Sequence, residues 1–298
     1  MTERRADDAA TLRATLRGVR GLLLDLDGVI VVAGAAVPGA AEALASLERR
    51  RLPYRIVTNT SMVSRESLSN WSARLGARVP PERFHSALSV SAAWTAERFP
   101  GEALYVLASD DARREFDGQR LLTHDEASSP DARAAAVVVG DSPEQATWDN
   151  LNRAFRLLRN GAQLVGMHKN RWWLTPDGPT LDSGAFVAGL EFASGVRARI
   201  VGKPAAAFFR VAAADIAAEI RRNGGGAVRR ADLAMVGDDV WTDALAARRA
   251  GLRGFVVLTG KHGHEELERA AAMRRGGGRP DGVARSLADI VAALDSPA

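Results

Sequence analysis

The sequence predicts an α/β protein: a Rossmann-like parallel sheet core with a second α/β unit inserted into it. Short apolar runs such as Leu22–Leu24 are typical of strands buried on both faces, as in parallel sheets. These runs alternate with helical patterns at the spacing of right-handed strand–helix–strand units. Several runs also end in carboxylate, hydroxyl or lysine side chains. Ligands of open α/β sheets bind outside the carboxyl ends of the strands, so chemistry is expected at these positions.

The first part of the chain shows strand, helix, strand and helix in turn. The first strand ends in Asp25-Leu26-Asp27-Gly28, and the second ends in Thr58 and Asn59. Residues 1–17 are polar and compatible with a loose arm. The elements expected in order are strand 19–25, helix 38–51, strand 54–57 and a helix capped by Ser64.

The inserted unit begins where this pattern breaks, near residue 80, and ends near residue 199. We therefore divide the chain into a core, residues 1–80 and 199–298, and an insert, residues 81–198. The elements expected in the insert are helix 89–98, strand 103–107, strand 135–139, helix 148–159, strand 163–166, a turn at Pro176-Asp177-Gly178 and a helix opened by 181–184.

The core pattern resumes with the strand exit Ile200–Pro204, which carries Lys203. A later strand ends in Asp238 and Asp239, and Asp243 is expected to open the following helix. The remaining expected elements are an Ala-rich helix ending near residue 222, strands 233–237 and 255–258, and a last helix over 287–294.

Composition excludes several function classes. The chain has no cysteine, so it has no disulfide framework, thiolate metal site or cysteine nucleophile. Its sequence pI is about 10.0, but 40 Lys and Arg stand against 36 Asp and Glu. The basic clusters are short and free of aromatics, so no nucleic-acid partner is expected. No apolar run is long enough to cross a bilayer, and the N-terminus lacks an apolar signal region. A cytoplasmic protein without a membrane partner is expected.

The strand-end residues suggest phosphate chemistry. Carboxylates gathered at one sheet edge repel one another unless a cation neutralises them. Oxygen ligands without His or Cys favour a hard ion, above all Mg²⁺. A lysine and a hydroxyl in the same place suit a phosphate dianion. One carboxylate can attack phosphorus, and a second can serve as general acid and base.

Each of these residues also has a purely structural interpretation. Asp25 and Asp27 can form a turn before Gly28, and Thr58 can cap a turn. Lys203 can be a solvated loop lysine. Asp243 can be a helix N-cap as well as a residue that supports a metal ligand.

Taken together, the motifs resemble the haloacid dehalogenase-like hydrolases. Four signatures of that family occur here in order: Asp25-Leu26-Asp27-Gly28, Thr58-Asn59, Gly202-Lys203-Pro204 and Gly237-Asp238-Asp239 followed by Asp243. The placement of the insert resembles the class IIA branch, which carries a C2-type α/β cap. Three further segments resemble members of that branch: 168–171, 182–186 and 259–261.

The resemblance implies roles for the residues of the first two motifs. Asp25 would be the nucleophile and a Mg²⁺ ligand. Asp27 would be the general acid and base, with its backbone carbonyl on Mg²⁺. Thr58 would bind the phosphoryl group, together with the backbone N–H groups of Asn59 and Gly28.

The later motifs would complete the site. Lys203 would stabilise charge on the nucleophile and on the transferring phosphoryl group. Asp238 would bind Mg²⁺, while Asp239 and Asp243 would position that ligand. Asp182 would be a candidate substrate contact from the cap.

The function that follows is a Mg²⁺-dependent phosphatase acting through an aspartyl-phosphate on a small phosphorylated substrate. The alternative is a non-catalytic phosphate-binding or regulatory protein on the same fold. The resemblance also suggests a homodimer formed through the cap. The sequence identifies neither the substrate nor the roles of His168, Trp172 and Trp173.

Overall fold

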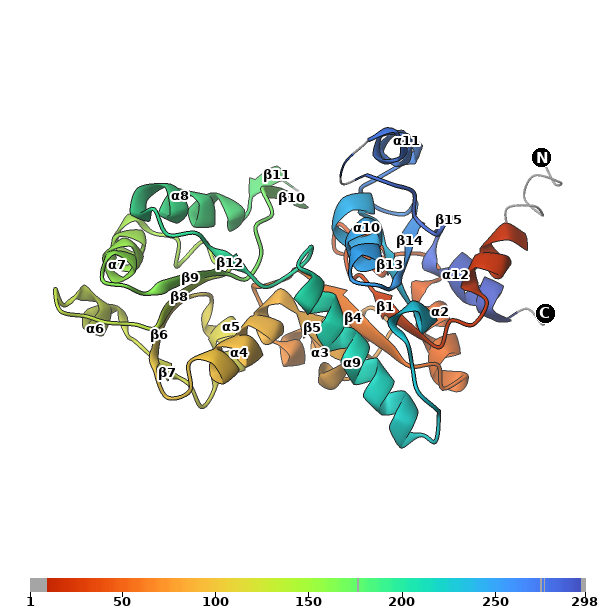
Figure 1. Ribbon diagram of the computed structural model, residues 1–298, viewed down its shortest axis with the longest axis horizontal. Helices are drawn as coiled ribbons and strands as arrows, with labels where there is room; N and C mark the ends of the chain where they lie inside the picture. Colours follow the sequence, from red (N-terminus) through yellow and green to blue (C-terminus); the bar gives the residue numbers. More distant parts are fainter. Residues whose placement is uncertain (1–9, 176, 274, 276, 296–298) are drawn as a thin grey trace. The chain divides into compact units, whose positions relative to one another are not determined.

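The protein is described here by a computed structural model, which covers residues 10–175, 177–273, 275 and 277–295 (Figure 1). The chain divides into two compact units. The first unit comprises the residues up to Thr58, Ser69–His85 and the residues from Lys203 onward. The second unit comprises Asn59–Leu68 and Ser86–Gly202. Each unit has its own parallel sheet, so they are described one at a time.

The first unit contains a six-stranded sheet with the strand order β15-β14-β13-β1-β4-β5. The pairings of β1 with β13 and β4, and of β14 with β13 and β15, are all parallel. The strands are β1 (Gly21–Leu24), β4 (Tyr54–Thr58), β5 (Phe84–Ser86), β13 (Leu233–Gly237), β14 (Arg253–Val257) and β15 (Gly282–Ala284).

The direction in which strands are added to this sheet reverses between β1 and β13. The chain goes from β1 outward to β4 and β5, and later from β13 outward to β14 and β15 on the other side. In doubly wound sheets a ligand binds at the carboxyl ends of the strands beside such a reversal. Leu22, Leu23 and Leu24 are fully buried, as the apolar run predicted. The fold therefore places the residues after β1 and β13 where a ligand site is expected.

Helices cover this sheet with apolar faces. Phe208, Phe209 and Ile216 on α9 are fully buried. The residues expected to form a loose arm include a helix over 10–16 whose Leu12 and Leu16 are buried, while residues 1–9 lie outside the described residues. The helices that contribute to this unit are α2 (Ala40–Arg49), α3 (Arg65–Arg74, which spans the division), α9 (Ala206–Arg222), α10 (Leu245–Arg249), α11 (His264–Ala272) and α12 (Leu287–Asp295).

The second unit contains a five-stranded sheet, β12-β9-β8-β6-β7, in which all pairings are parallel. Helices α7 and α8 lie side by side against it (Figure 1). Its elements are α4 (Ala87–Arg98), β6 (Ala103–Leu107), α5 (Asp110–Arg113), β7 (Arg120–Leu121), α6 (His124–Ser128), β8 (Ala136–Val139), α7 (Trp148–Arg159), β9 (Gln163–Gly166), β10 (Trp172–Thr175), β11 (Gly178–Leu181), α8 (Gly184–Ser194) and β12 (Arg199–Ile200).

One strand assignment from the sequence was wrong. The short strand before Lys203 was expected to join the core sheet, but β12 pairs with β9 of the second sheet. Lys203 therefore does not end a strand of the first sheet. The pattern also failed to predict α11, β15 and two antiparallel pairs, β2 (Val31–Val32) with β3 (Ala35–Ala36) and β10 with β11.

Candidate active site

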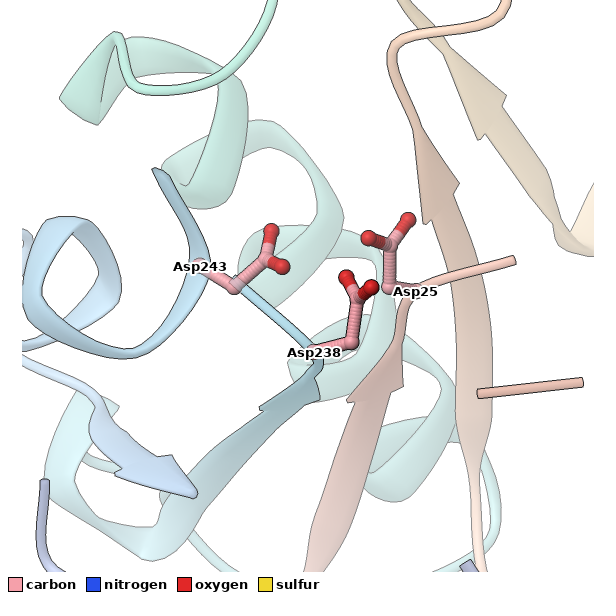
Figure 2. A group of neighbouring side chains, drawn as sticks. All are labelled: Asp25, Asp238 and Asp243. Carbon is pink, nitrogen blue, oxygen red and sulfur yellow. The ribbon is translucent and has the colours of Figure 1, made fainter. Parts of the chain in front are cut away.

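Three carboxylates converge at the reversal point of the first sheet (Figure 2). Asp25 follows β1 directly, Asp238 follows β13, and Asp243 lies one turn further along the chain. Figure 2 shows the three side chains pointing toward one another, and each offers an oxygen within 4.8 Å of the others. All three are buried. Parallel strand ends therefore bring together residues more than 200 positions apart in the sequence.

Lys203 lies between two of these carboxylates. Its Nζ is 2.7 Å from Asp25 Oδ1 and 2.8 Å from Asp243 Oδ1. Burial alone would lower the pKa of Lys203, but the charges of Asp243 and Asp25 raise it above its ordinary value. The lysine is therefore held in its charged form, and one ammonium stands against three carboxylates.

Burial and the excess negative charge together raise the pKa values of the three carboxyl groups. Burial raises the pKa of Asp25 to about 6, of Asp238 to about 7 and of Asp243 to about 8. Repulsion adds to burial, since Asp238 acts on Asp25, Asp25 acts on Asp243, and Asp243 acts on Asp238. A divalent cation would offset both the cost of burying these charges and the repulsion between them. An all-oxygen donor set suits Mg²⁺. The residues present therefore fit the expected metal.

The turn after β13 is capped by a different aspartate from the one that the sequence predicted. Asp243 was interpreted as a helix N-cap, but the capping residue is Asp239, which accepts the N–H groups of Trp241 (2.8 Å) and Thr242 (3.0 Å). Asp243 lies inside the single π-helical turn η4 (Val240–Ala244), where its Oδ2 accepts the Asp239 N–H at 3.2 Å. Asp239 thus caps the turn that contains Asp243.

The other residues of the first two motifs differ in exposure and in the unit to which they belong. The Asp27 side chain is exposed, whereas Thr58, the last residue of β4, is buried. Asn59 belongs to the second unit, where its Nδ2 donates to Asn170 Oδ1 at 3.2 Å. The Gly28 N–H, expected to bind phosphate, donates to the Val31 carbonyl at 2.6 Å. That donor is therefore already engaged within its own loop.

The position of Gly28 leaves no room for a side chain. Its φ is +77°, and a Cβ at this position would lie 2.1 Å from Asp238 Oδ2. Gly260 on the loop after β14 packs against the same oxygen, and the neighbouring Lys261 N–H donates to it at 2.6 Å. Thr259 Oγ1 donates to the Gly28 carbonyl at 2.5 Å. The Thr-Gly-Lys segment thus closes around Asp238, which the sequence suggested only through resemblance.

We expect Gly28→Ala to destabilise the protein by about 2 kcal/mol more than Gly34→Ala. Both glycines have a similar left-handed φ, +77° and +80°, and an alanine in that region costs about 1 kcal/mol. Only Gly28 adds a clash, because nothing lies within 4 Å of the Gly34 Cβ position. Denaturant unfolding of the two variants measures the difference, and equal losses would contradict the close packing of Gly28 on Asp238.

The second unit buries two of the residues that the sequence left open. His168 lies in the loop after β9 and is almost fully buried, with its Nε2 3.1 Å from Ser61 Oγ and 3.6 Å from Asp182 Oδ1. Asp182 is also buried. Trp172 and Trp173, on β10, keep 48% and 40% of their surface exposed, so they do not form part of a packed core.

Two family models match the chain. One, described as haloacid dehalogenase-like hydrolase, matches residues 22–121, and another, described as HAD-hydrolase-like, matches residues 200–290. The chain is 34% identical over 249 residues to the haloacid dehalogenase-like hydrolase domain-containing protein 2 of Bos taurus, covering 84% of this chain and 88% of that protein. The chain belongs to the haloacid dehalogenase-like hydrolases.

The other similarities fall in the same family. The phospholysine phosphohistidine inorganic pyrophosphate phosphatase of Homo sapiens is 34% identical over 252 residues, covering 83% of this chain and 85% of that protein. The solved p-nitrophenyl phosphatase of Archaeoglobus fulgidus matches at a TM-score of 0.78 and 26% identity, covering 92% of this chain and 99% of that chain. The glycerol phosphate phosphatase of Mycobacterium tuberculosis in complex with magnesium matches at a TM-score of 0.76 and 25% identity, covering 93% and 77%. The predicted resemblance to the class IIA branch of this family is thereby confirmed, and so is the predicted fold class, an α/β protein with a Rossmann-like parallel sheet core and an inserted α/β unit. Across the described part of the chain, none of the helices is long and apolar enough to cross a membrane.

Proposed function

We propose that this protein is a Mg²⁺-dependent phosphatase that hydrolyses a small phosphate ester, phosphoramidate or pyrophosphate through an aspartyl-phosphate on Asp25. The observation that carries the proposal is the pairing of Asp25 with Lys203 at 2.7 Å, inside a cluster of three buried carboxylates at the reversal point of the sheet. Relatives named as phosphatases of phospholysine, phosphohistidine, inorganic pyrophosphate and glycerol phosphate support the reaction class.

The orientation of Asp25 suits a nucleophile. Its Oδ1 accepts the Leu26 N–H at 2.8 Å and pairs with Lys203, so both interactions fix the same oxygen. Among the described residues no donor lies on Oδ2, which is thus available to attack phosphorus. The new bond forms from Asp25 to phosphorus as the bond to the leaving group breaks.

Asp27 completes the proton transfers in this proposal. Its exposed carboxyl gives a proton to the leaving oxygen or nitrogen and later takes one from the water that attacks the aspartyl-phosphate. That second step releases inorganic phosphate and restores Asp25. Thr58 and the Asn59 N–H bind the transferring group, and Lys203 stabilises its charge.

The metal would be held by Asp25, Asp238 and the backbone carbonyl of Asp27. Bound there, Mg²⁺ supplies charge neutralisation for the transferring phosphoryl group. Asp239 and Asp243 would position these ligands without binding the metal themselves. Asp239 caps the turn after β13, and Asp243 holds Lys203 through an ion pair.

We propose that residues 1–80 and 199–298 form the catalytic core and residues 81–198 the C2-type cap. The first and second units differ from this division mainly by placing 59–68 and 199–202 in the second unit and 81–85 in the first. In this proposal Asp182 serves the substrate from the cap, the cap forms a homodimer, and the protein works in the cytoplasm on a small phosphorylated molecule. Gel filtration with light scattering tests the dimer directly.

We expect Mg²⁺ to raise the melting temperature far more at pH 8 than at pH 5.5. The pKa values of Asp25, Asp238 and Asp243 are raised in the folded protein, to about 6, 7 and 8. The metal-free folded state therefore binds more protons than the unfolded chain, and its stability falls as pH rises above about 4. Mg²⁺ replaces those protons, and it adds about 2.7 kcal/mol at one hundred times its Kd.

Thermal scans with Mg²⁺ and with EDTA at both pH values measure this effect. Taking the difference between the two scans removes the contribution of groups that do not bind metal. The Asp238→Asn variant should lose most of the pH 8 increment. An increment of the same size at both pH values would show that these carboxylates do not bind the ion.

Phosphate release from p-nitrophenyl phosphate and a panel of phosphorylated metabolites, with Mg²⁺ and with EDTA, tests the function itself. Metal-dependent release of phosphate supports the proposal, and release that is much faster from one compound than from the others identifies the substrate. Binding of phosphate without any turnover by the folded, Mg²⁺-loaded protein would instead support the phosphate-binding alternative.

A further inference from the structure

The second unit has a sheet edge of its own that the proposed reaction does not use. Its strand order also reverses once, between β6 and β8, because β7 is added on one side of β6 and β8, β9 and β12 on the other. Asp141 is the second residue after β8, and His168 is the second residue after β9. Both therefore lie at the carboxyl edge of the parallel sheet, and Asp141 lies at the reversal itself, where α/β sheets bind ligands.

Asp141 is buried without a partner for its charge. It keeps only 8% of its surface exposed. Its backbone N–H donates to Ser61 Oγ at 2.8 Å, but among the described residues no hydrogen-bond donor or cationic side chain lies on its carboxylate. Its carboxylate oxygens are not among the fully buried side-chain atoms that lack a hydrogen-bond partner within the described residues, so they still reach solvent. The structure thus leaves one acceptor group at this edge unused.

A second buried carboxylate lies near it. Asp182 keeps 4% of its surface exposed, and its Oδ1 accepts the Ser183 N–H at 2.7 Å. Burial raises the pKa of Asp141 to about 6, and the charges of Asp182 and Glu144 raise it further. The two carboxyl groups are therefore close enough to repel each other. No lysine or arginine within the described ranges pairs with either of them.

His168 does not supply the missing positive charge. Burial lowers its pKa, which favours the neutral ring. Its Nδ1 accepts the Asn170 N–H at 3.4 Å, so the ring proton is on Nε2, which faces Ser61 Oγ at 3.1 Å and Asp182 Oδ1 at 3.6 Å. Ser183 Oγ lies 3.3 Å from the same nitrogen. The group thus holds two anions, a neutral imidazole and two hydroxyls.

The spacing of these groups favours an organic cation over a metal ion. Among the described residues, only Asp25, Asp238 and Asp243 bring three carboxylate or imidazole ligand atoms within 4.8 Å of one another. Asp141, Asp182 and His168 are more widely spaced than that. An ammonium group donates three hydrogen bonds and can bridge acceptors that are too far apart to share one metal ion.

We propose that Asp141 and Asp182, with Ser61 and His168 behind them, form a binding site for a primary ammonium group in the second unit. The ammonium can belong to the phosphorylated substrate, a reading that rests on the proposed phosphatase function, or to a free amine that binds as a separate ligand. The two sources share one chemistry, and an experiment with two arms distinguishes them.

The first arm measures binding without turnover. Isothermal titration calorimetry of the full chain with ethanolamine is compared with ethylene glycol, which lacks the charge. We expect the wild type to bind ethanolamine and not the glycol. Loss of one charge-assisted hydrogen bond in Asp141→Asn should weaken binding by about tenfold or more. Asp149→Asn, on the exposed first turn of α7, is the matched control and should bind as the wild type does.

The second arm compares two substrates of equal size, phosphoethanolamine and 2-hydroxyethyl phosphate. If the ammonium belongs to the substrate, the wild type should favour phosphoethanolamine by about tenfold or more in kcat/KM, and Asp141→Asn should bring that ratio close to one. If the ammonium belongs to a separate ligand, ethanolamine binds but the ratio is close to one in both proteins. The ratio is internal to each variant, so a general loss of activity does not alter it.

Protein stability shows whether the variants are folded. Removing an unpaired buried charge should leave the melting temperature of Asp141→Asn equal to or above that of the wild type, and Asp182→Asn provides a second, independent variant. A wild type that neither binds ethanolamine nor prefers phosphoethanolamine overturns the site. So does binding that Asp141→Asn and Asp182→Asn leave unchanged. A wild type inactive on p-nitrophenyl phosphate overturns the proposed phosphatase, while the calorimetry still decides the ammonium site.

Discussion

Replacing Asp25 with asparagine is expected to abolish turnover, with kcat on p-nitrophenyl phosphate falling about ten-thousand-fold or more. An amide oxygen is a poor nucleophile and cannot form the aspartyl-phosphate on which the proposed reaction depends. The fold should survive the change. Asparagine keeps an oxygen that can accept from the Leu26 N–H and Lys203, and it removes one of three buried carboxylates that repel one another.

A covalent readout separates loss of the nucleophile from loss of the metal. Acid quenching of the wild type during turnover should trap phosphate on the protein in a form that hydroxylamine releases, and Asp25→Asn should trap none. Asp149→Asn, on the surface of α7, is the control and should keep the wild-type rate. Substantial turnover by Asp25→Asn would remove Asp25 from the mechanism and leave the carboxylate cluster as a metal site only.

The strand ends of the first sheet were predictable because they depend on local pattern and on one general rule. Three leucines followed by Asp25, and Leu233–Val236 followed by Gly237 and Asp238, identify two buried strands with acidic exits. Parallel topology then brings the two exits to one edge. The meeting of Asp25 with Asp238 needed no further information.

Lys203 shows where this reasoning fails. Its strand, β12, has two residues, and nothing local in so short a strand decides which of two parallel sheets it joins. The prediction that Lys203 lies near the carboxylates was correct, but it rested on assigning β12 to the first sheet, which is wrong. The error over Asp243 has a similar cause, since Asp239 and Asp243 are both good N-caps and only the turn itself reveals which one is used.

The buried group around His168 was beyond prediction for a different reason. Ser61 and His168 are 107 residues apart, and neither belongs to a repeating pattern that indicates burial. Polar residues after a strand are normally exposed. Only the tertiary arrangement shows that this histidine lies beside Asp182 and that Asp141 has no donor.

Replacing Lys203 with methionine should destabilise the protein by about 3–5 kcal/mol and lower kcat by about a hundredfold or more. The lysine is buried, and its Nζ pairs with both Asp25 and Asp243, so its removal leaves two buried carboxylates without a counter-charge. The loss should be largest near pH 8. At pH 5.5 it should shrink, because carboxyl groups with raised pKa values are already protonated there.

A double variant separates stability from catalysis at this position. Adding Asp243→Asn to Lys203→Met removes one of the stranded charges, so the melting temperature should recover while kcat stays low, since nothing restores the positive charge beside Asp25. Lys261→Met is the matched control, because Lys261 Nζ also reaches a carboxylate, Asp239 at 3.3 Å, but keeps about half of its side chain exposed. Exposed pairs contribute little, so that variant should melt close to the wild type. Should the single and double Lys203 variants unfold at the same temperature, the buried ion pair with Asp243 contributes no stability, and the positioning role proposed for Asp243 loses its basis.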